Sequence, residues 1–328
     1  MISIIAEIGS VHDGSLGNAL RLIDAAADAG ADTVKFQTHI AEAESLPNAP
    51  APGFFSDEPR VAYFKRTGFT LDQWKRLARH AESCGVTFLS SPFALEAVDL
   101  LEEVGMKAYK VPSGEVTNLP LLERIAATGK PALLSSGMSD WAELDHAVTK
   151  LAPASPLTIL QCTSAYPCPP EQVGLNVIGE MRSRYGVPVG FSDHTLGCAA
   201  AFAAAALGAT VVEKHFTFSR LMYGSDAKHS MEPAEFRVFC TGLREIWRMN
   251  ASPVVKKDTA PYADMKRIFQ KSIVTARALP AGVVLTRDML AFKKPGDGIP
   301  AAEYQSVLGR KLRAALPIDH QLSTQDFE

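Results

Sequence analysis

The sequence lacks the features of membrane-spanning, disulfide-rich and zinc-ribbon proteins. No apolar run reaches the ~18 residues of a membrane-spanning helix, and the Ala-rich stretch at 199–209 is short enough to form a buried helix. The five cysteines of this 328-residue chain include no CxxC pair, which argues against a zinc ribbon and against a disulfide framework. The first residues show no basic segment and no cleavage site of a signal peptide. We therefore expect a cytoplasmic protein with reduced thiols and no membrane partner.

A large excess of charge of one sign is also absent, so we expect no nucleic-acid partner. The formal net charge is −3, without the strong basic excess that binds nucleic acid. Residues 251–328 carry 12 basic and 8 acidic side chains, a net of +4, whereas the remainder has 21 and 28, a net of −7. A basic C-terminal segment beside an acidic body fits either an anionic substrate or an ordinary solvated surface. The hydrophobic fraction of 47% and charged fraction of 21% are ordinary for a globular protein.

One pattern repeats through the first ~245 residues, a length typical of a single barrel domain. A short β-branched run is followed by a polar or Gly-rich loop and then by an amphipathic stretch such as 16–29, 71–84 or 95–104. The apolar runs are continuous, as in parallel strands buried on both faces. These eight candidate strands span residues 2–8, 33–37, 87–90, 108–111, 132–135, 157–162, 187–191 and 210–214. The glycines that follow the helical stretches and indicate their ends are Gly30, Gly85, Gly105 and Gly129.

Eight alternating strand–helix units predict an α/β fold of the TIM (β/α)8 barrel type. An open doubly wound sheet is the alternative, but the first turn, Gly9-Ser-Val-His-Asp-Gly14, lacks the GxGxxG spacing. Residues 38–70 are polar and Pro-rich without a clear helical period. Because long loops on compact domains are usually functional, we expect this loop to serve the site.

The pattern changes after residue 250. We expect a barrel domain at 1–250, a linker at 251–265 and a small β-rich domain at 266–328. Residues 279–290 resemble residues 316–327, and each follows a strand-like run, at 272–278 and 311–315. This repeat predicts a small pseudo-symmetric β module, a size at which a single core is marginal.

Polar and ionisable side chains follow the ends of all eight predicted strands, where a barrel forms its active site. A buried charge without a partner costs several kcal/mol, so a ring of lysines, carboxylates and hydroxyls indicates an anionic ligand. Lys35 and Lys110 are the expected anion-binding cations, with hydroxyl hydrogen bonds from Ser113 and Ser192. The residues named at these ends also include Glu7, Ser91, Phe93, Glu115, Ser164, Tyr166 and Glu213.

Two histidines lie at the ends of adjacent predicted strands. His194 and His215 would reach one metal ion there, and two imidazoles with water and substrate oxygens suit an ion such as Mn²⁺. Glu213 would then accept a hydrogen bond from a metal-bound water. His12 and His39 follow the first two predicted strands. The remaining histidines are expected on loops or helix surfaces.

Several motifs together resemble the sialic acid synthase family over nearly the whole chain. The C-terminal segment resembles that family's antifreeze-like (SAF) domain of the β-clip type. The motifs are Ala6-Glu-Ile-Gly9, Val34-Lys-Phe-Gln-Thr38, Ser91-Pro-Phe93, Tyr109-Lys-Val-Pro-Ser-Gly-Glu115, Phe191-Ser-Asp-His-Thr195, Glu213-Lys-His-Phe216 and Lys294-Pro-Gly-Asp-Gly-Ile299.

The resemblance implies a phosphoenolpyruvate-dependent enzyme that condenses this substrate with an N-acetylated hexosamine, typically N-acetylmannosamine. It implies a divalent cation, Mn²⁺ ahead of Mg²⁺ or Co²⁺, held by His194 and His215, and a homodimer in which the SAF domain covers the partner's barrel. By the same resemblance, phosphoenolpyruvate is held by Lys35, Lys110, Ser113 and Ser192. The sugar or the reacting centre is contacted by Glu7, Glu115, Tyr166 and Asp226, and Glu213 or Glu115 acts on the attacking water. The further substrate-binding residues are Ser91, Phe93, Ser164 and Lys294.

Departures from the family pattern bear on the sugar. Val11 and Ser164 stand where asparagines are common, and Lys294 stands where an arginine reaches the sugar's N-acyl group. Lysine lacks the planar donor fork of arginine. The alternatives are a legionaminic, pseudaminic or spore-coat polysaccharide synthase of the same family, a non-catalytic sugar- or phosphate-binding homologue, and a metal-dependent aldolase or isomerase.

Overall fold

The computed structural model describes residues 1–50, 58–153 and 156–328. The chain divides into two compact units, Met1–Ser252 and Pro253–Glu328. The domain limits at 250 and 265 stay predictions, and helix α11 (Ala263–Phe269) runs across the second of them. No helix in the described part of the chain is long and apolar enough to cross a membrane.

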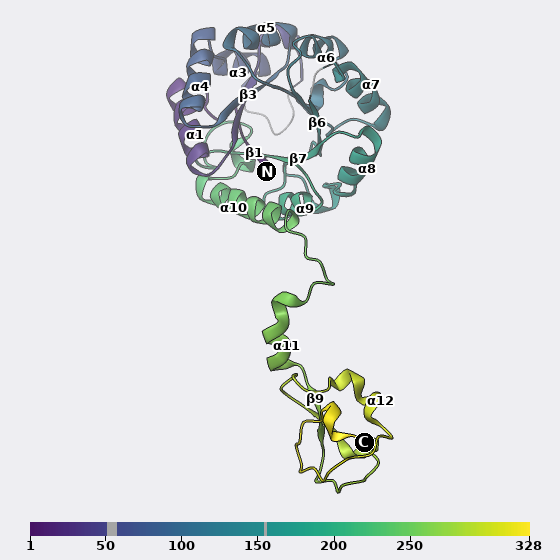
Figure 1. Ribbon diagram of the computed structural model, residues 1–328. Helices are drawn as coiled ribbons and strands as arrows, with labels where there is room; N and C mark the ends of the chain where they lie inside the picture. Colours follow the sequence, from purple (N-terminus) through teal and green to yellow (C-terminus); the bar gives the residue numbers. More distant parts are fainter. Residues whose placement is uncertain (51–57, 154–155) are drawn as a thin grey trace. The chain divides into compact units, whose positions relative to one another are not determined.

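The first unit is the predicted TIM-like barrel. Its eight strands are all parallel, in the order β3-β2-β1-β8-β7-β6-β5-β4, and β3 and β4 at the two ends of this order contact each other. The sheet is therefore a nearly closed barrel, which Figure 1 shows surrounded by a ring of helices. The strands are β1 (Ser3–Gly9), β2 (Thr33–Thr38), β3 (Thr87–Pro92), β4 (Tyr109–Val111), β5 (Ala132–Ser135), β6 (Leu157–Cys162), β7 (Val189–Asp193) and β8 (Val211–His215).

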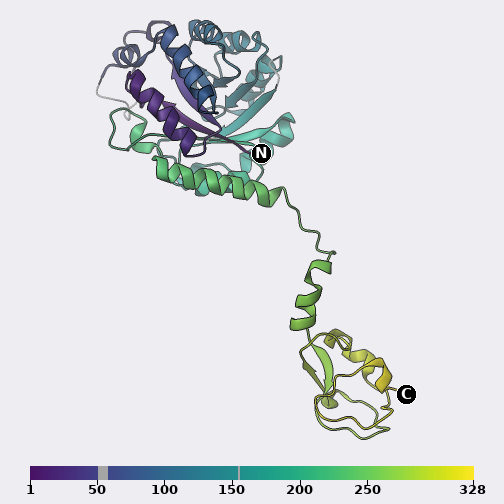
Figure 2. The same cartoon turned by 60° about the vertical axis from the view of Figure 1, so that its left-hand side comes forward.

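The helices begin and end at residues with a local physical reason. Thr70 with Gln73, and Asp140 with Glu143, form reciprocal capping boxes that satisfy free backbone N–H groups. Gly105 ends its helix in the left-handed conformation at φ 88°, which favours glycine. Figure 2 shows α1 and α10 lying outside the strands. The barrel helices are α1 (Leu16–Asp28), α2 (Ala41–Glu44), α3 (Arg60–Thr67), α4 (Leu71–Ser83), α5 (Leu95–Val104), α6 (Leu119–Ala126), α7 (Trp141–Leu151), α8 (Asn176–Tyr185), α9 (Ala199–Ala206) and α10 (Pro233–Asn250).

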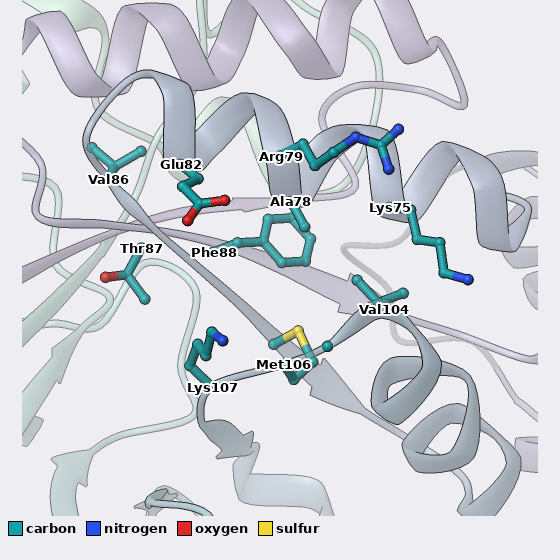
Figure 3. A pocket seen from close by; sticks show the side chains of 11 residues that line it. Lys75, Ala78, Arg79, Glu82, Val86, Thr87, Phe88, Val104, Met106 and Lys107 are labelled. Atoms are coloured by element: carbon teal, nitrogen blue, oxygen red, sulfur yellow. The ribbon is translucent and has the colours of Figure 1, made fainter.

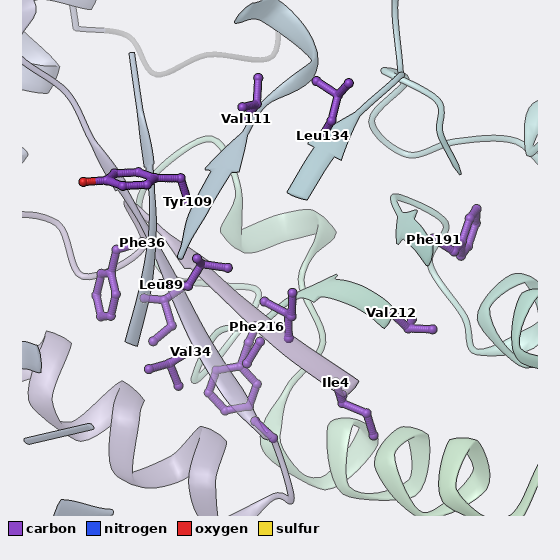
Figure 4. Packing of buried hydrophobic residues seen from close by; sticks show 14 of the residues in the cluster. Ile4, Val34, Phe36, Leu89, Tyr109, Val111, Leu134, Phe191, Val212 and Phe216 are labelled. Atoms are coloured by element: carbon purple, nitrogen blue, oxygen red, sulfur yellow. The ribbon is translucent and has the colours of Figure 1, made fainter. Parts of the chain in front are cut away.

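Alternation along each strand separates the core from the site. Successive strand residues point to opposite faces. On β2 the buried Val34 and Phe36 belong to the apolar core, whereas Lys35 and Gln37 line a polar cavity. Figure 4 shows Val34 and Phe36 with other core residues packed along the strands. One face of each strand therefore packs against the helices, and the other face supplies side chains to the barrel interior.

The polar segment 38–70 differs from the single loop that we expected. It contains α2 and α3, and α3 buries Tyr63 and Phe64. A helix of eight residues covers about two turns, too few to show a period in the sequence. Residues 51–57 of this segment lie outside the described residues.

The second unit confirms the predicted internal repeat. Leu279 and Leu316 pair with each other in an antiparallel bridge. Three residues after each of them, Gly282 and Asp319 both have positive φ, at 79° and 64°. The two copies also place a short 3₁₀ turn at the same offset, Arg287–Met289 and Thr324–Asp326.

Only two segments of this unit form a regular sheet. β9 (Ser272–Thr275) pairs antiparallel with β10 (Leu290–Lys293). The predicted run 311–315 makes isolated bridges instead of a strand, through Lys311 and Leu312. A separate apolar core that includes Ile273 and Phe327 holds the unit together, and a short helix α12 spans Tyr304–Val307.

The fold predicts a strong steric requirement at Gly190 on β7. A Cβ there would lie 2.4 Å from Leu160 Cδ2 and 2.6 Å from the Val211 carbonyl oxygen. We expect Gly190→Ala to lower the free energy of unfolding by about 1–3 kcal/mol, the usual effect of overpacking. Urea denaturation followed by tryptophan fluorescence measures it, because all three tryptophans lie in the barrel unit.

Gly179→Ala is the matched control. Gly179 lies inside α8, and nothing lies within 4 Å of the position of an added Cβ. We expect this change to stabilise the barrel by about 0.5–1 kcal/mol, the helix preference for alanine. Equal unfolding midpoints for the two variants would contradict the steric argument at Gly190.

Candidate functional site

A polar cavity of about 370 Å³ lies at the carboxyl ends of the barrel strands. Strand register brings its side chains together, because Glu7 on β1 is opposite both Lys35 on β2 and His215 on β8. Twelve of the fifteen residues expected at the site line this cavity. They are Glu7, Lys35, Ser91, Phe93, Lys110, Ser113, Ser164, Tyr166, Ser192, His194, Glu213 and His215.

Two lysines and two glutamates form a buried charge network in the cavity. Lys35 Nζ lies 2.9 Å from Glu7 Oε2 and 3.5 Å from Glu213 Oε1. Lys110 Nζ lies 3.6 Å from the same Glu213 oxygen. All four side chains are at most 6% exposed. Such a network is stable only when its charges are paired, so the four residues depend on one another.

Glu213 is the central carboxylate of this network. Burial would raise its pKa, but the ammonium groups of Lys110 and Lys35 outweigh this and lower the pKa to about 2. Burial lowers the pKa of Lys110, whereas the two carboxylates overcome burial and raise the pKa of Lys35. Glu213 therefore stays ionised and holds both lysines at the cavity wall.

Hydroxyl groups extend the network toward the cavity. Lys110 Nζ donates to Ser135 Oγ at 2.7 Å, and Lys35 Nζ donates to Ser91 Oγ at 3.4 Å. Ser192 Oγ donates to Glu213 Oε1 at 3.1 Å. An ammonium group carries three N–H donors, so Lys110, with two oxygen neighbours in the network, keeps one for a ligand. The cavity wall can therefore bind a small anion between two cations and several hydroxyls.

The imidazoles of His194 and His215 fit a divalent metal ion. Their ring centroids are 5.7 Å apart. His194 Nδ1 donates to the Thr163 carbonyl oxygen at 2.8 Å, which leaves the Nε2 lone pair free as a ligand. The buried Nδ1 of His215 has no hydrogen-bond partner among the described residues. Burial lowers the pKa of both rings and favours the neutral, ligating form.

Three expected residues lie outside the cavity lining. Glu115 follows β4 and accepts from Asn118 Nδ2 at 2.8 Å, and burial raises its pKa. Asp226 lies beside the end of β1, where a Cβ on Gly9 would be 2.7 Å from Asp226 Oδ2. Lys294 belongs to the second unit, and its Nζ lies 4.9 Å from the centroid of the Phe269 ring.

A chain of hydrogen bonds runs from the cavity to α2. Gln37 Nε2 donates to Glu7 Oε1 at 2.7 Å, and Gln37 Oε1 lies 3.2 Å from His39 Nε2. His39 Nδ1 lies 2.9 Å from Glu44, and the His39 ring stacks between Phe64 and Phe93. The long segment after β2 therefore contacts the site through Gln37, which belongs to the motif Val34–Thr38 but to which the sequence analysis assigned no role.

Lys214, to which the sequence analysis also assigned no role, supports the site from the other face of β8. It is flanked by Glu213 and His215, which line the cavity, so alternation turns Lys214 to the other face of β8. Its Nζ lies 2.8 Å from Asp193 Oδ2 and also donates to the backbone carbonyl oxygens of Thr195 and Gly197. This buried pair fixes the turn that carries His194.

A second hollow lies at the opposite end of the strands (Figure 3). It is formed by α4, the start of β3 and the turn before β4, and Lys75, Arg79 and Lys107 lie around it. Residues at the amino ends of barrel strands usually serve stability. None of the predicted site residues lines this second hollow.

The Lys214–Asp193 pair generates a stability prediction. We expect Lys214→Met to lower the free energy of unfolding by about 3–5 kcal/mol, because Asp193 is left as an unpaired buried charge. Urea denaturation measures this. Lys150→Met is the control, since its pair with Glu123 is about half exposed and its loss costs at most about 1 kcal/mol. A similar midpoint for both variants would refute the proposed role of Lys214.

Comparison with known proteins gives the same assignment along the chain. The NeuB family model matches residues 22–254, and the SAF domain model matches residues 270–328. The N,N'-diacetyllegionaminic acid synthase of Campylobacter jejuni is 39% identical over 316 residues, covering 94% of each chain. The N-acetylneuraminate-9-phosphate synthase of Homo sapiens is 36% identical over 324 residues, covering 96% of this chain and 90% of that relative.

A solved structure agrees with the sequence comparisons. The crystal structure of N-acetylneuraminic acid synthetase from Leptospira borgpetersenii, in complex with citrate, matches with a TM-score of 0.74 at 30% identity. The match covers 81% of this chain and 90% of that chain. The NeuB match alone covers more than half of the sequence. The chain therefore belongs to the NeuB family of phosphoenolpyruvate-dependent nonulosonic acid synthases, enzymes that use a divalent metal ion, and carries a C-terminal SAF domain.

Proposed function

We propose that the protein condenses phosphoenolpyruvate with an open-chain N-acetylated hexosamine and water, giving a nonulosonic acid and phosphate. N-acetylmannosamine is the first candidate acceptor. The observation that carries this proposal is the single cavity that joins the paired cations Lys35 and Lys110 to the imidazoles His194 and His215. An anionic donor and a polarised aldehyde acceptor would meet there within reach of each other.

The lysines and hydroxyls bind phosphoenolpyruvate in this proposal. Lys35 and Lys110 face its phosphate and carboxylate, and Ser91, Ser113 and Ser192 contact the same groups. Glu213 holds the two ammonium groups in position before substrate arrives, so little reorganisation is needed on binding. The charges of two lysines and two glutamates cancel at the cavity wall before the substrate binds. Bound phosphoenolpyruvate would add its negative charge to this wall.

His194 and His215 would hold the divalent metal, with Mn²⁺ as the proposed ion. When bound, this ion supplies Lewis-acid polarisation of the sugar aldehyde. Tyr166 supports the arrangement, because its ring centroid lies 4.2 Å from that of His194. Glu7, Phe93, Ser164, Asp226 and Lys294 are proposed to contact the sugar.

The bonds made and broken balance without any further reactant. The enol carbon of phosphoenolpyruvate attacks the sugar aldehyde and forms the new C–C bond. Water adds to the resulting cationic C2 and loses a proton, and the former aldehyde oxygen takes up a proton to become a hydroxyl. The C–O bond to phosphate then breaks, leaving the 2-keto acid and inorganic phosphate.

The carboxylates differ in fitness for moving the proton of the attacking water. Efficient proton transfer at neutral pH needs a group whose pKa lies near that pH. The pKa of Glu213 is held at about 2, whereas burial raises that of Glu115. We therefore assign the positioning of Lys35 and Lys110 to Glu213, and the action of Glu213 or Glu115 on the attacking water stays a prediction.

A second acceptor follows from one specific observation. The Campylobacter jejuni relative, 39% identical to this chain, is named for N,N'-diacetyllegionaminic acid. The precursor of that acid is our second candidate acceptor, and the pseudaminic precursor belongs in the same panel. We further propose that the enzyme acts in the cytoplasm as a homodimer whose SAF domain covers the partner's barrel.

The direct test is sugar-dependent release of phosphate from phosphoenolpyruvate, with Mn²⁺ and with EDTA. We expect release with one sugar of the panel, lost in EDTA and reduced by at least ~10³-fold in His194→Ala, because a Lewis acid supplies several kcal/mol. Near-native rates in EDTA would remove the metal from the proposal. A folded, Mn²⁺-loaded protein that releases no phosphate with any of the sugars would overturn the proposed function.

Lys294→Arg tests the contact with the N-acyl group. A guanidinium offers a planar fork where the lysine offers a point charge. We expect the variant to raise kcat/KM for N-acetylmannosamine by ~10-fold, about the effect of one added hydrogen bond to a charged donor. Lys293→Arg is the neighbouring control and should leave kcat/KM unchanged. Unchanged or lower kcat/KM in Lys294→Arg would remove Lys294 from acyl recognition.

A further inference from the structure

Three metal-ligating side chains meet between α1 and α4, on the outside of the barrel. Asp24 lies on α1, His80 lies on α4, and Cys84 is the residue at which α4 ends. Asp24 Oδ1 lies 2.6 Å from His80 Nε2 and 3.4 Å from Cys84 Sγ, and Cys84 Sγ lies 3.7 Å from His80 Nε2. Within the described residues, this is the one group of three or more such side chains whose ligand atoms all lie within 4.8 Å.

The three distances approximate one face of a tetrahedron around a metal ion. With metal–sulfur bonds of about 2.3 Å and metal–nitrogen or –oxygen bonds of about 2.0 Å, tetrahedral edges are about 3.5 Å to sulfur and about 3.3 Å between nitrogen and oxygen. Both sulfur edges already fit. The Asp24–His80 edge has to lengthen by about 0.7 Å, which replaces their hydrogen bond with two bonds to the ion.

The arrangement does not fit a nucleophilic cysteine. In such a site the histidine contacts the nucleophile through one ring nitrogen and is oriented through the other. Here the carboxylate and the sulfur both approach His80 Nε2. An activated thiolate also needs a neighbouring positive charge, whereas the oxygen of Asp24 lies beside Cys84 Sγ. The shared approach to one nitrogen is what ligands of one ion show.

The helices hold the three side chains in place. His80 and Cys84 are four residues apart and therefore share one face of the helical turn. α1 and α4 pack against each other, as they also lie in Figure 1. Arg21 Nη1 donates to Asp24 Oδ2 at 2.8 Å, which turns Oδ1 toward His80 and Cys84. Histidine and aspartate are about 29% exposed, so water can complete the coordination.

We propose that Asp24, His80 and Cys84 form a second metal site, which binds Zn²⁺ and fastens α4 to α1. Thiolate and imidazole ligands select Zn²⁺ over the oxygen-preferring Mn²⁺ and Mg²⁺. Thiolate and carboxylate together neutralise the two charges of the ion. The site is separate from the pair His194 and His215 and does not depend on the proposed catalytic function.

The test uses full-length protein from which metal has been removed, with His194→Ala and His215→Ala to eliminate binding at the barrel mouth. We expect one Zn²⁺ per chain by equilibrium dialysis, and with Co²⁺ alone a thiolate-to-metal charge-transfer absorption. Zn²⁺ should also raise the thermal midpoint of this protein, since a ligand that binds only the folded state stabilises it. Absence of both Zn²⁺ and the absorption would overturn the proposal.

Substitutions of cysteine assign the ligand. Cys84→Ser in the same background should abolish the absorption and weaken Zn²⁺ binding by more than ~100-fold, beyond the effect of losing an outer partner of a ligand. Cys198→Ser, another half-buried cysteine, and Cys162→Ser, whose Sγ lies 3.8 Å from His194, should leave both unchanged. An absorption that persists in Cys84→Ser, or that disappears in Cys162→Ser, would contradict the site.

Activity separates this inference from the proposed function. With His194 and His215 intact, Cys84→Ser should keep Mn²⁺-dependent phosphate release, and in the background that lacks these two histidines it should lose the Zn²⁺-dependent rise in thermal midpoint. Circular dichroism shows whether the variant is folded. Loss of the thermal shift with activity retained supports the second site, and a full thermal shift in Cys84→Ser refutes it.

Discussion

The balance of charge inside the barrel is the constraint on which the rest of the site depends. Lys35 and Lys110 lie almost fully buried, and each requires a nearby carboxylate to remain charged there. Glu213 serves both lysines through one oxygen, while Ser192 donates to the same oxygen. Loss of Glu213 would therefore leave two buried cations without their shared partner, even before any substrate is considered.

Strand alternation explains why this network could be predicted from the sequence. The eight apolar runs interrupted by a charged or hydroxyl residue at their carboxyl ends indicated both the barrel and the residues of its mouth. Positions on one face of β1, β2, β4 and β8, near the carboxyl ends of the strands, then enter the cavity, as Glu7, Lys35, Lys110 and Glu213 do. The repeat in the second unit was equally readable, because its two copies keep their leucines and turns at matching offsets.

Two of the features that sequence reasoning missed depend on relations between distant segments. The pairing of Lys214 with Asp193 follows from the register of β7 and β8, which places these two residues opposite each other. The contact of His80 with Asp24 joins residues 56 positions apart and depends on how α4 is rotated against α1. The helices α2 and α3 are too short to show a period. Local sequence patterns show neither the register of two paired strands nor the rotation of one helix against another.

The opposite facings of Lys214 and His215 have an evolutionary consequence. Deletion or insertion of one residue early in β8 would slip its side chains by one position, and in a strand this exchanges the two faces. The imidazole would then enter the helix layer and the ammonium group the substrate cavity. Changes in length must therefore gather in the loops around β8, where they leave its alternation intact. The alternation of side chains therefore allows the loops to change in length but requires a fixed spacing of residues within β8.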